Sequence, residues 1–212
     1  MNLPNGITVA RVVAAPVIFA LILSGGFGQL VLAFIVFVVA AVSDIWDGYL
    51  ARRRGQITDF GKLADPIADK LLVLSTFVPF YVVSVREGGV TDLAVVPFWG
   101  VLPLWVLIVI LGREFLITLF RGFAKRKGVV IAAGKAGKYK ALFQNLFIGG
   151  EILWLALRSR ALERGWDSPF WSFWKVFHGS YVAITLAIAV VLTAYSLAVY
   201  LWRYRGLVAR SL

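Results

Sequence analysis

The sequence has no cysteine, a single histidine and only 11 acidic residues among its 212. The absence of cysteine excludes a disulfide framework, a thiolate nucleophile and a thiolate-ligated metal, so any metal ion must be bound by oxygen atoms or by His178. Charged residues make up only 16% of the chain and hydrophobic residues 60%, and the mean hydropathy is +0.85. This composition argues strongly against a water-soluble globular protein.

Long apolar runs account for this composition. A bilayer core about 30 Å thick is crossed by about 20 helical residues, and six runs of suitable length lie near residues 7–24, 29–52, 61–83, 94–120, 137–157 and 177–202. The first run is expected to be a retained helix rather than a signal peptide. The sequence therefore predicts an all-α integral membrane protein with six transmembrane helices, organised as a single domain over residues 1–212.

The 22 lysines and arginines give a net charge of +11, which alone would suggest a nucleic-acid partner. They are confined, however, to short stretches between the apolar runs, and most fall on one side of the membrane if the N-terminus is cytoplasmic. We therefore predict no nucleic-acid partner and a multi-pass protein with both termini in the cytoplasm. Short cytoplasmic and outer interfacial helices are also expected, the outer one over residues 168–174, where Ser168 can cap a helix that begins at Pro169.

Four aspartates lie where the second and third apolar runs approach the predicted cytoplasmic side. Asp44 and Asp47 are three residues apart, and Asp65 and Asp69 are four apart, so each pair projects from one face of its helix. In an antiparallel hairpin, Asp44 lies opposite Asp69, and Asp47 lies opposite Asp65. All four carboxylates are thus expected to converge at one depth, about 12 Å from the end of the helix.

Carboxylates gathered in a region of low dielectric repel each other, and each aspartate costs about 3 kcal/mol to insert at the centre of a membrane helix. A compact cluster of oxygen ligands without His or Cys is typical of a hard divalent ion, so we predict Mg²⁺, Mn²⁺ or Ca²⁺ rather than zinc. Four carboxylates can hold two such ions, an arrangement suited to clamping the phosphates of a substrate. The alternatives are salt bridges that neutralise the carboxylates, or an ion-conducting relay.

Gly48 and Gly61 are expected to lie near each other, one helical turn closer to the cytoplasm than the aspartates. Small residues at this place would allow the two helices to pack closely. They would also leave room for a nucleotide or a phosphate beside the metal ions. The residues alone leave both interpretations open.

The segment from Asp44 to Asp69 reads D-x-x-D-G-x-x-A-R-x8-G-x-x-x-D-x-x-x-D, with every fixed position of this pattern filled. In this it resembles the CDP-alcohol phosphatidyltransferases. The resemblance implies a six-helix membrane enzyme, often a homodimer, with an active site open to the cytoplasm. Members of the family transfer a substituted phosphate from a CDP-linked donor to an alcohol and release CMP.

Within this family, the flanking segments are similar to those of bacterial phosphatidylglycerolphosphate synthases: N-x-P-N-x-x-T-x-x-R from Asn2 to Arg11, D-P-x-A-D-K from Asp65 to Lys70, and Arg113-Glu114-Phe115. The likeness covers roughly residues 2–145 and departs at Ala141, where threonine is usual. It implies a protein of the bacterial cytoplasmic membrane that transfers the phosphatidyl group from CDP-diacylglycerol to glycerol 3-phosphate. The alternatives are a sister enzyme with inositol phosphate, serine or phosphatidylglycerol as acceptor, and, from another class, a cation transporter.

The family pattern also implies roles for individual residues. One Mg²⁺ or Mn²⁺ would be bound by Asp44, Asp47 and Asp65, and a second by Asp47, Asp65 and Asp69. Asp69 ends the motif and is our candidate for the catalytic base. The donor site would be formed by Asn5, Thr8, Gly48, Ala51, Arg52 and Gly61.

Basic residues beyond the motif predict where the acceptor binds. Arg113 and Arg121 are eight residues apart and thus share a helix face, and a cationic cradle suits a phosphorylated acceptor. Glu114 is expected to neutralise one of these cations, and His178, far from the aspartates, to be structural. The candidate acceptor residues are Arg113, Arg121, Lys135 and Lys138.

Overall fold

The computed structural model describes residues 3–54, 59–88, 93–127 and 135–209, without the side chains of residues 3–4, 45, 47–54, 59–63, 125–126, 135–136, 203 and 205–209. The described chain is helical, apart from its connections. Its six helices are α1 (Leu3–Ser24), α2 (Phe27–Arg54), α3 (Asp59–Glu87), α4 (Leu104–Arg126), α5 (Lys135–Arg164) and α6 (Pro169–Ala209).

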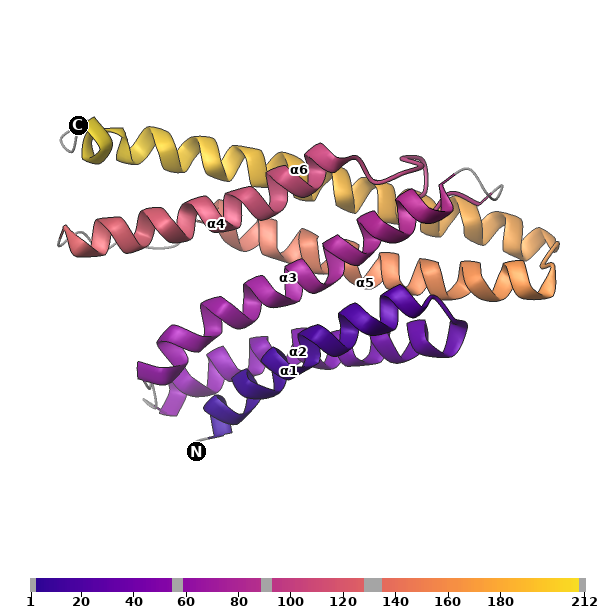
Figure 1. Ribbon diagram of the computed structural model, residues 1–212, viewed down its shortest axis with the longest axis horizontal. Coiled ribbons are helices and arrows are strands. Elements are labelled where there is room, and N and C mark those ends of the chain that lie inside the picture. The colour runs from indigo at the N-terminus through magenta and orange to yellow at the C-terminus, as the bar shows by residue number, and fades with distance from the viewer. Residues whose placement is uncertain (1–2, 55–58, 89–92, 128–134, 210–212) are drawn as a thin grey trace.

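The helices run back and forth along the long axis of the molecule, so both chain termini lie at the same end (Figure 1). The ends of α2 and α4 and the beginnings of α3 and α5 lie at this end as well, which we call the pocket end. Helices α1, α2 and α3 pack together as one group, and α5 and α6 with α4 as another. Contacts of α2 with α5 and of α3 with α4 join the two groups.

Aromatic side chains fill the junction between the groups. Phe77 and Phe80 of α3 and Phe147 of α5 are completely buried. The ring of Phe147 lies 5.3 Å from that of Phe77 and 5.8 Å from that of Phe80, between centroids. Contacts of this kind add to the apolar area that they bury, so this cluster holds α5 against α3.

Of two adjacent glycines in α5, only Gly150 is required by a close helix approach, because a Cβ atom at Gly149 would make an ordinary van der Waals contact. A Cβ atom at Gly149 would lie 3.5 Å from the ring of Phe37 in α2, and one at Gly150 would lie 2.5 Å from the ring of Tyr181 in α6. The second distance is shorter than any tolerated contact, so a side chain at Gly150 would push α6 away. Buried His178 of α6 contacts the carbonyl oxygen of Gly150 through Nε2 at 2.9 Å. It lies far from the aspartates, as expected of a structural histidine.

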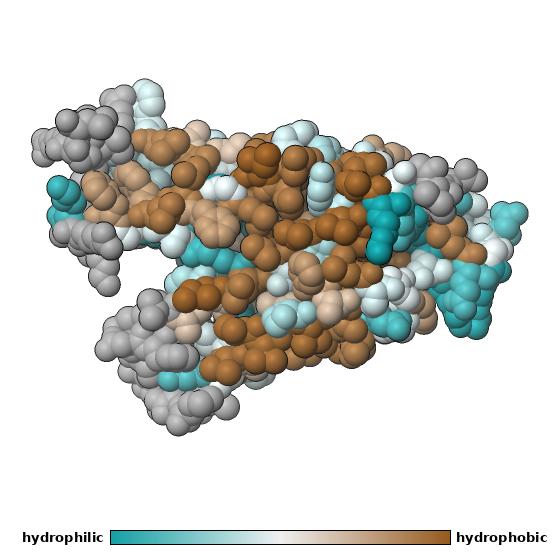
Figure 2. All heavy atoms as spheres, in the orientation of Figure 1, coloured by the Kyte–Doolittle hydropathy of each residue, from teal (hydrophilic) through white to brown (hydrophobic). Residues whose placement is uncertain are grey.

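Among the residues that the structure describes, four helices contain segments long and apolar enough to cross a membrane: Asn5–Ser24, Phe27–Asp44, Ala64–Glu87 and Pro169–Trp202. Figure 2 shows the corresponding surface, a broad hydrophobic band across the middle of the molecule with hydrophilic side chains gathered toward its ends. An integral membrane protein is therefore indicated. Helices α4 and α5 carry more charge, including Glu114 and Glu151 within them.

The fourth helix begins later than the sequence analysis expected. Helix α4 starts at Leu104 rather than near residue 94. The preceding residues form a turn closed by a bridge between Val96 and Gly100, in which Phe98 has φ 61° and Gly100 φ 74°. Pro97 within this turn and Pro103 after it interrupt helical hydrogen bonding.

The expected outer interfacial helix over residues 168–174 is not a separate element. Helix α6 runs without interruption from Pro169 to Ala209, because no proline follows Pro169 within it and Gly179 is accommodated inside the helix. Its capping is as expected, since Ser168 Oγ accepts a hydrogen bond from the backbone N–H of Trp171 at 3.1 Å. The part of the chain described here contains no separate short helix at the pocket end either.

Candidate active site

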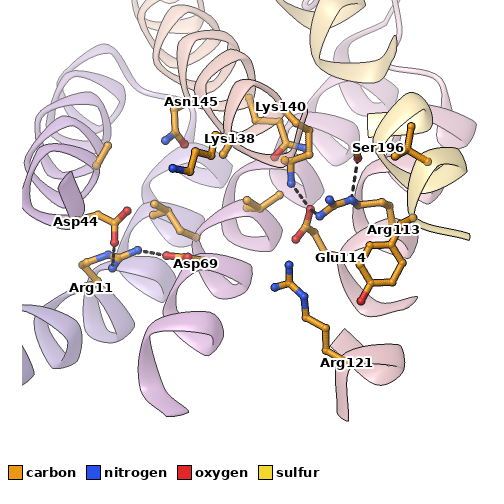
Figure 3. A pocket seen from close by; sticks show the side chains of 18 of the residues that line it. Arg11, Asp44, Asp69, Arg113, Glu114, Arg121, Lys138, Lys140, Asn145 and Ser196 are labelled. Atoms are coloured by element: carbon orange, nitrogen blue, oxygen red, sulfur yellow. Dashed lines mark hydrogen bonds and ion pairs between the residues drawn. The ribbon is translucent and has the colours of Figure 1, made fainter. Parts of the chain in front are cut away.

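A pocket of about 350 Å³ is lined by residues of all six helices. Figure 2 shows the molecule hollowed at the pocket end, between the ends of α2 and α3 and those of α4 and α6. The side chains around the pocket are divided by charge (Figure 3). Asp44 and Asp69 line it from α2 and α3, which we call the acidic wall, and cations line it from α4 and α5, which we call the basic wall.

The acidic wall is organised by an arginine of α1. One terminal nitrogen of the Arg11 guanidinium donates a hydrogen bond to Oδ1 of Asp44, and the other donates to Oδ1 of Asp69. Both contacts are ion pairs, drawn as dashed lines in Figure 3. Asp44 of α2 and Asp69 of α3 are thus joined through one guanidinium of α1, the helix against which both α2 and α3 pack.

A second contact with α1 lies one helical turn earlier. Thr8 Oγ1 donates a hydrogen bond to Oδ1 of Asp65 at 2.7 Å. Thr8 and Arg11 are three residues apart and therefore share the face of α1 that meets the carboxylates. Both side chains are buried. Three carboxylates from α2 and α3 are thus held by one face of α1.

The remaining predicted metal and donor residues are only partly described. Asn5 lies on α1 and is half-buried. The surroundings of the other predicted residues at the ends of α2 and α3 lie outside the described side chains. Within the described ones, no group of three or more His, Cys, Asp or Glu side chains is assembled tightly enough to hold a metal. The predicted residues whose surroundings the structure does not describe are Asp47, Gly48, Ala51, Arg52 and Gly61.

The basic wall is built around Glu114 of α4. Its Oε1 accepts hydrogen bonds from Arg113 Nη1, at 3.1 Å, and from Lys140 Nζ of α5. These side chains are only 11% and 6% exposed, so their charges are largely removed from water. Glu114 therefore neutralises buried cations, as expected, although one of its two partners is Lys140 rather than a predicted acceptor residue.

Arg113 is also held from α6 and lies beside the beginning of α5. Its Nε donates a hydrogen bond to Ser196 Oγ at 3.1 Å. A Cβ atom at Gly137 would lie 3.7 Å from Nη2 of Arg113. Arg121 and Lys138, both exposed, line the same pocket. Three of the four predicted acceptor residues are thus brought together, while the side chain of Lys135 lies outside the description.

Sequence reasoning missed several residues of this pocket. Arg11 is predicted only as the end of the N-x-P-N-x-x-T-x-x-R segment, with no role assigned to it, although a charged residue inside an apolar run at membrane depth is itself a sign of function. Lys140 is not among the predicted acceptor residues, although it lines the pocket. Ser196 and Tyr200 of α6 line the pocket as well, and they lie in an apolar run that carries no recognisable motif.

The two walls together can bind a highly charged phosphorylated substrate. Carboxylate oxygens are suited to a hard divalent ion, and arginines and lysines are suited to a phosphate group. The model for the CDP-alcohol phosphatidyltransferase family matches residues 1–202. The chain belongs to this family. The match extends through α5 and most of α6, beyond the region around residues 2–145 in which the sequence motifs are recognisable.

Individual relatives within the CDP-alcohol phosphatidyltransferases carry two kinds of name. The chain is 34% identical to a Bacillus subtilis CDP-diacylglycerol–glycerol-3-phosphate 3-phosphatidyltransferase over 164 residues, which cover 72% of this chain and 77% of the relative. It is 38% identical over 155 residues to a probable phosphatidylglycerophosphate synthase of Mycobacterium tuberculosis, covering 72% of this chain and 66% of the relative. It is also 34% identical over 181 residues to a CMP-forming cardiolipin synthase of Streptomyces coelicolor, covering 81% and 75%.

Removing the charge of Glu114 should destabilise the protein. In the Glu114→Gln variant, Arg113 and Lys140 remain buried without their counterion, a change that costs about 3–5 kcal/mol when one partner of a buried ion pair is removed. The free energy of unfolding, measured in detergent micelles, should fall by this amount. Glu163→Gln is the matched control, because its ion pair with Arg160 involves a carboxylate that is 61% exposed, and its loss should cost less than about 1 kcal/mol. Equal losses in the two variants would contradict this account.

Proposed function

We propose that this chain transfers the phosphatidyl group of CDP-diacylglycerol to glycerol 3-phosphate, giving phosphatidylglycerol phosphate and CMP. The observation that carries the proposal is a single pocket with Asp44 and Asp69 on one wall and Arg113, Arg121 and Lys138 on the other. A transferase that joins two phosphorylated substrates needs two phosphate-binding surfaces that face the same space. The basic wall can bind phosphate directly, and the acidic wall can do so through metal ions. The names of the Bacillus and Mycobacterium relatives support this choice of acceptor.

The acidic wall is proposed to hold one or two Mg²⁺ or Mn²⁺ ions. Its donor chemistry fits, since Asp44, Asp65 and Asp69 offer only oxygen, and Asp47 is proposed as the fourth ligand. A metal ion bound there would withdraw charge from the phosphorus under attack and from the departing CMP. The donor nucleotide is proposed to bind at the same wall, beside Asn5, Gly48, Ala51, Arg52 and Gly61.

The chain's own residues orient the acceptor and take its proton. Arg113, Arg121 and Lys138, with Lys135, are proposed to hold the phosphate of glycerol 3-phosphate, which places its free hydroxyl toward the acidic wall. Asp69 accepts the proton of this hydroxyl. The hydroxyl oxygen forms a bond to the phosphorus that carries diacylglycerol, and the bond from this phosphorus to the oxygen of CMP breaks, with CMP keeping the electron pair.

All six helices are proposed to cross the membrane as one domain, with the pocket end and both termini in the cytoplasm. Helix α4 has 23 residues and α5 has 30, enough to span about 35 Å and 45 Å. Their charges do not oppose insertion where they are paired inside the protein, as Glu114 is with Lys140 and Arg158 with Glu87. The family resemblance further supports a bacterial cytoplasmic membrane and a homodimer.

A sister reaction with phosphatidylglycerol as acceptor is the second candidate, favoured by the likeness to the Streptomyces cardiolipin synthase. Both reactions release CMP and use the same donor. They differ in the group that must bind at the basic wall. This group is a small soluble phosphate when glycerol 3-phosphate is the acceptor, and the glycerol headgroup of a lipid when phosphatidylglycerol is the acceptor. A wall with four described cations and one carboxylate beside the pocket is better matched to a phosphate that carries two negative charges.

The choice of acceptor is tested by following CMP release. Purified protein in micelles is incubated with CDP-diacylglycerol and Mg²⁺ or Mn²⁺, and with glycerol 3-phosphate, inositol phosphate, serine or phosphatidylglycerol in turn. We expect release with glycerol 3-phosphate that exceeds the others by at least tenfold. Release with another acceptor alone would replace this substrate, and cation flux in proteoliposomes without CMP release would indicate a transporter.

The role of Asp69 is tested by the Asp69→Asn variant. The amide cannot accept the hydroxyl proton, so kcat should fall by about 10²- to 10⁴-fold, while CDP-diacylglycerol binding changes little. Asp167→Asn is the matched control, because Asp167 is exposed just before α6. A kcat for Asp69→Asn within threefold of the wild-type value would exclude this base.

The basic wall is tested by the Arg121→Gln variant. Loss of a charge-assisted hydrogen bond to phosphate should raise KM for glycerol 3-phosphate by about 10- to 100-fold. KM for CDP-diacylglycerol should stay within about twofold of its wild-type value, since Arg121 lies on the opposite side of the pocket from the aspartates (Figure 3). Arg164→Gln, at the far end of α5, should change neither constant. If KM for the donor rose instead, Arg121 would belong to the donor site.

A further inference from the structure

Arg11 has an unusual position for a charged residue. It lies in the middle of an apolar helix, at 3% exposure, and is the α1 residue that contacts both α2 and α3 through ion pairs. A guanidinium so deeply buried must be compensated by partners, because its hydration is lost. Its two aspartates supply this compensation, which ties the position of Arg11 to the acidic wall.

The three side chains of this ion-pair group differ in their exposure. The side chain of Arg11 is 3% exposed, whereas those of Asp44 and Asp69 are 45% and 58% exposed. All three side chains line the pocket, and the two carboxylates keep much more exposed surface than the guanidinium that joins them. Each ion pair uses Oδ1 of its aspartate. A cation that enters from the pocket would meet carboxylates whose orientation is already set.

Thr8 repeats this arrangement one helical turn away. Its side chain is 1% exposed, and its hydroxyl donates to Oδ1 of Asp65. The same face of α1 thus donates hydrogen bonds to one aspartate of α2 and two of α3. The resemblance placed Thr8 at the donor site, but its hydrogen bond connects it to a carboxylate.

We propose that Arg11 and Thr8 are positioning residues for the divalent metal ion: Arg11 holds Asp44 and Asp69, which line the pocket, and Thr8 holds Asp65 on the same helix as Asp69. The inference rests on the metal-binding part of the proposed function. Groups that orient metal ligands commonly contribute 10- to 100-fold to metal affinity. Arg11 is suited to this task because a planar guanidinium can bind two carboxylates at once, which a lysine ammonium on a flexible stem does not do with the same geometry.

A competing role for Arg11 predicts the opposite change in metal affinity. If the guanidinium instead occupied the place of the metal ion, it would compete with the ion, and weakening its contacts would raise metal affinity. If it positions the ligands, weakening the same contacts lowers metal affinity. Arg11→Lys separates these roles because it retains the positive charge and changes only the geometry of the contacts.

The experiment measures Mn²⁺ binding without substrates. Purified full-length protein in micelles is titrated with Mn²⁺, and the free ion is followed by its EPR signal. Arg11→Lys should weaken Mn²⁺ binding by about 10- to 100-fold, and Thr8→Val, which removes one hydrogen bond, by roughly fivefold. Arg160→Lys is the matched control, since Arg160 pairs with Glu163 near the end of α5 away from the pocket, and it should bind Mn²⁺ like the wild type.

Thermal unfolding without metal identifies a purely structural role. Such a role would lower the melting temperature of Arg11→Lys while its Mn²⁺ affinity stayed unchanged, and this would overturn the inference. A raised affinity would overturn it as well, in favour of competition. Should Arg11→Lys not fold, Thr8→Val decides, and unchanged affinity in that variant overturns the inference.

The wild-type protein separates the inference from the proposed reaction. If it binds Mn²⁺ and the variants weaken this binding, but no acceptor gives CMP release, the positioning role stands and the proposed reaction is wrong. If the wild type releases CMP but binds no Mn²⁺, the inference is overturned and the reaction stands.

Discussion

Neutralisation of charge inside a helical bundle is the constraint on which the rest of this structure depends. Arg11 joins Asp44 and Asp69, and Glu114 joins Arg113 and Lys140. Each group draws its members from more than one helix, so breaking it would leave buried charge without a partner, a far larger penalty than the loss of an exposed ion pair. The charges needed at the pocket therefore also determine how the helices meet at this end.

The pocket lies where the two helix groups diverge. Farther along the bundle they are held together by the packing of α2 against α5 and of α3 against α4, and by the ring contacts of Phe147 with Phe77 and Phe80. At the pocket end each group keeps its own set of charges, negative with one buried arginine on one side and mostly positive on the other. Packing in the middle of the molecule thus brings the two opposite charge sets to face one pocket while keeping them apart.

Much of this arrangement could be predicted from the sequence, because it depends on spacing along helices. The opposition of Asp44 and Asp69 follows from helix periodicity in a hairpin, and the structure brings them to the same guanidinium. The partner itself was not predicted, since the contact of Arg11 with two other helices depends on tertiary packing. Ser196 belongs to a helix without a motif, and only its distance to Arg113 shows its place in the site. The beginning of α4 at Leu104 was missed because hydropathy alone does not register a proline-bounded turn.

The unbroken course of α6 has a consequence for where the enzyme meets its lipid. From Pro169, at the aromatic start of the helix, to Ser196, in the pocket, the chain rises about 40 Å at 1.5 Å per residue, close to the full thickness of a bilayer with its headgroups. Aromatic side chains favour the membrane–water boundary. The length of α6 therefore fixes the distance between one membrane boundary and the pocket. Bilayer thickness would thereby set how far the pocket stands from the plane of the headgroups at the other boundary, and the lipid composition of the membrane would govern how readily a membrane-anchored donor reaches it.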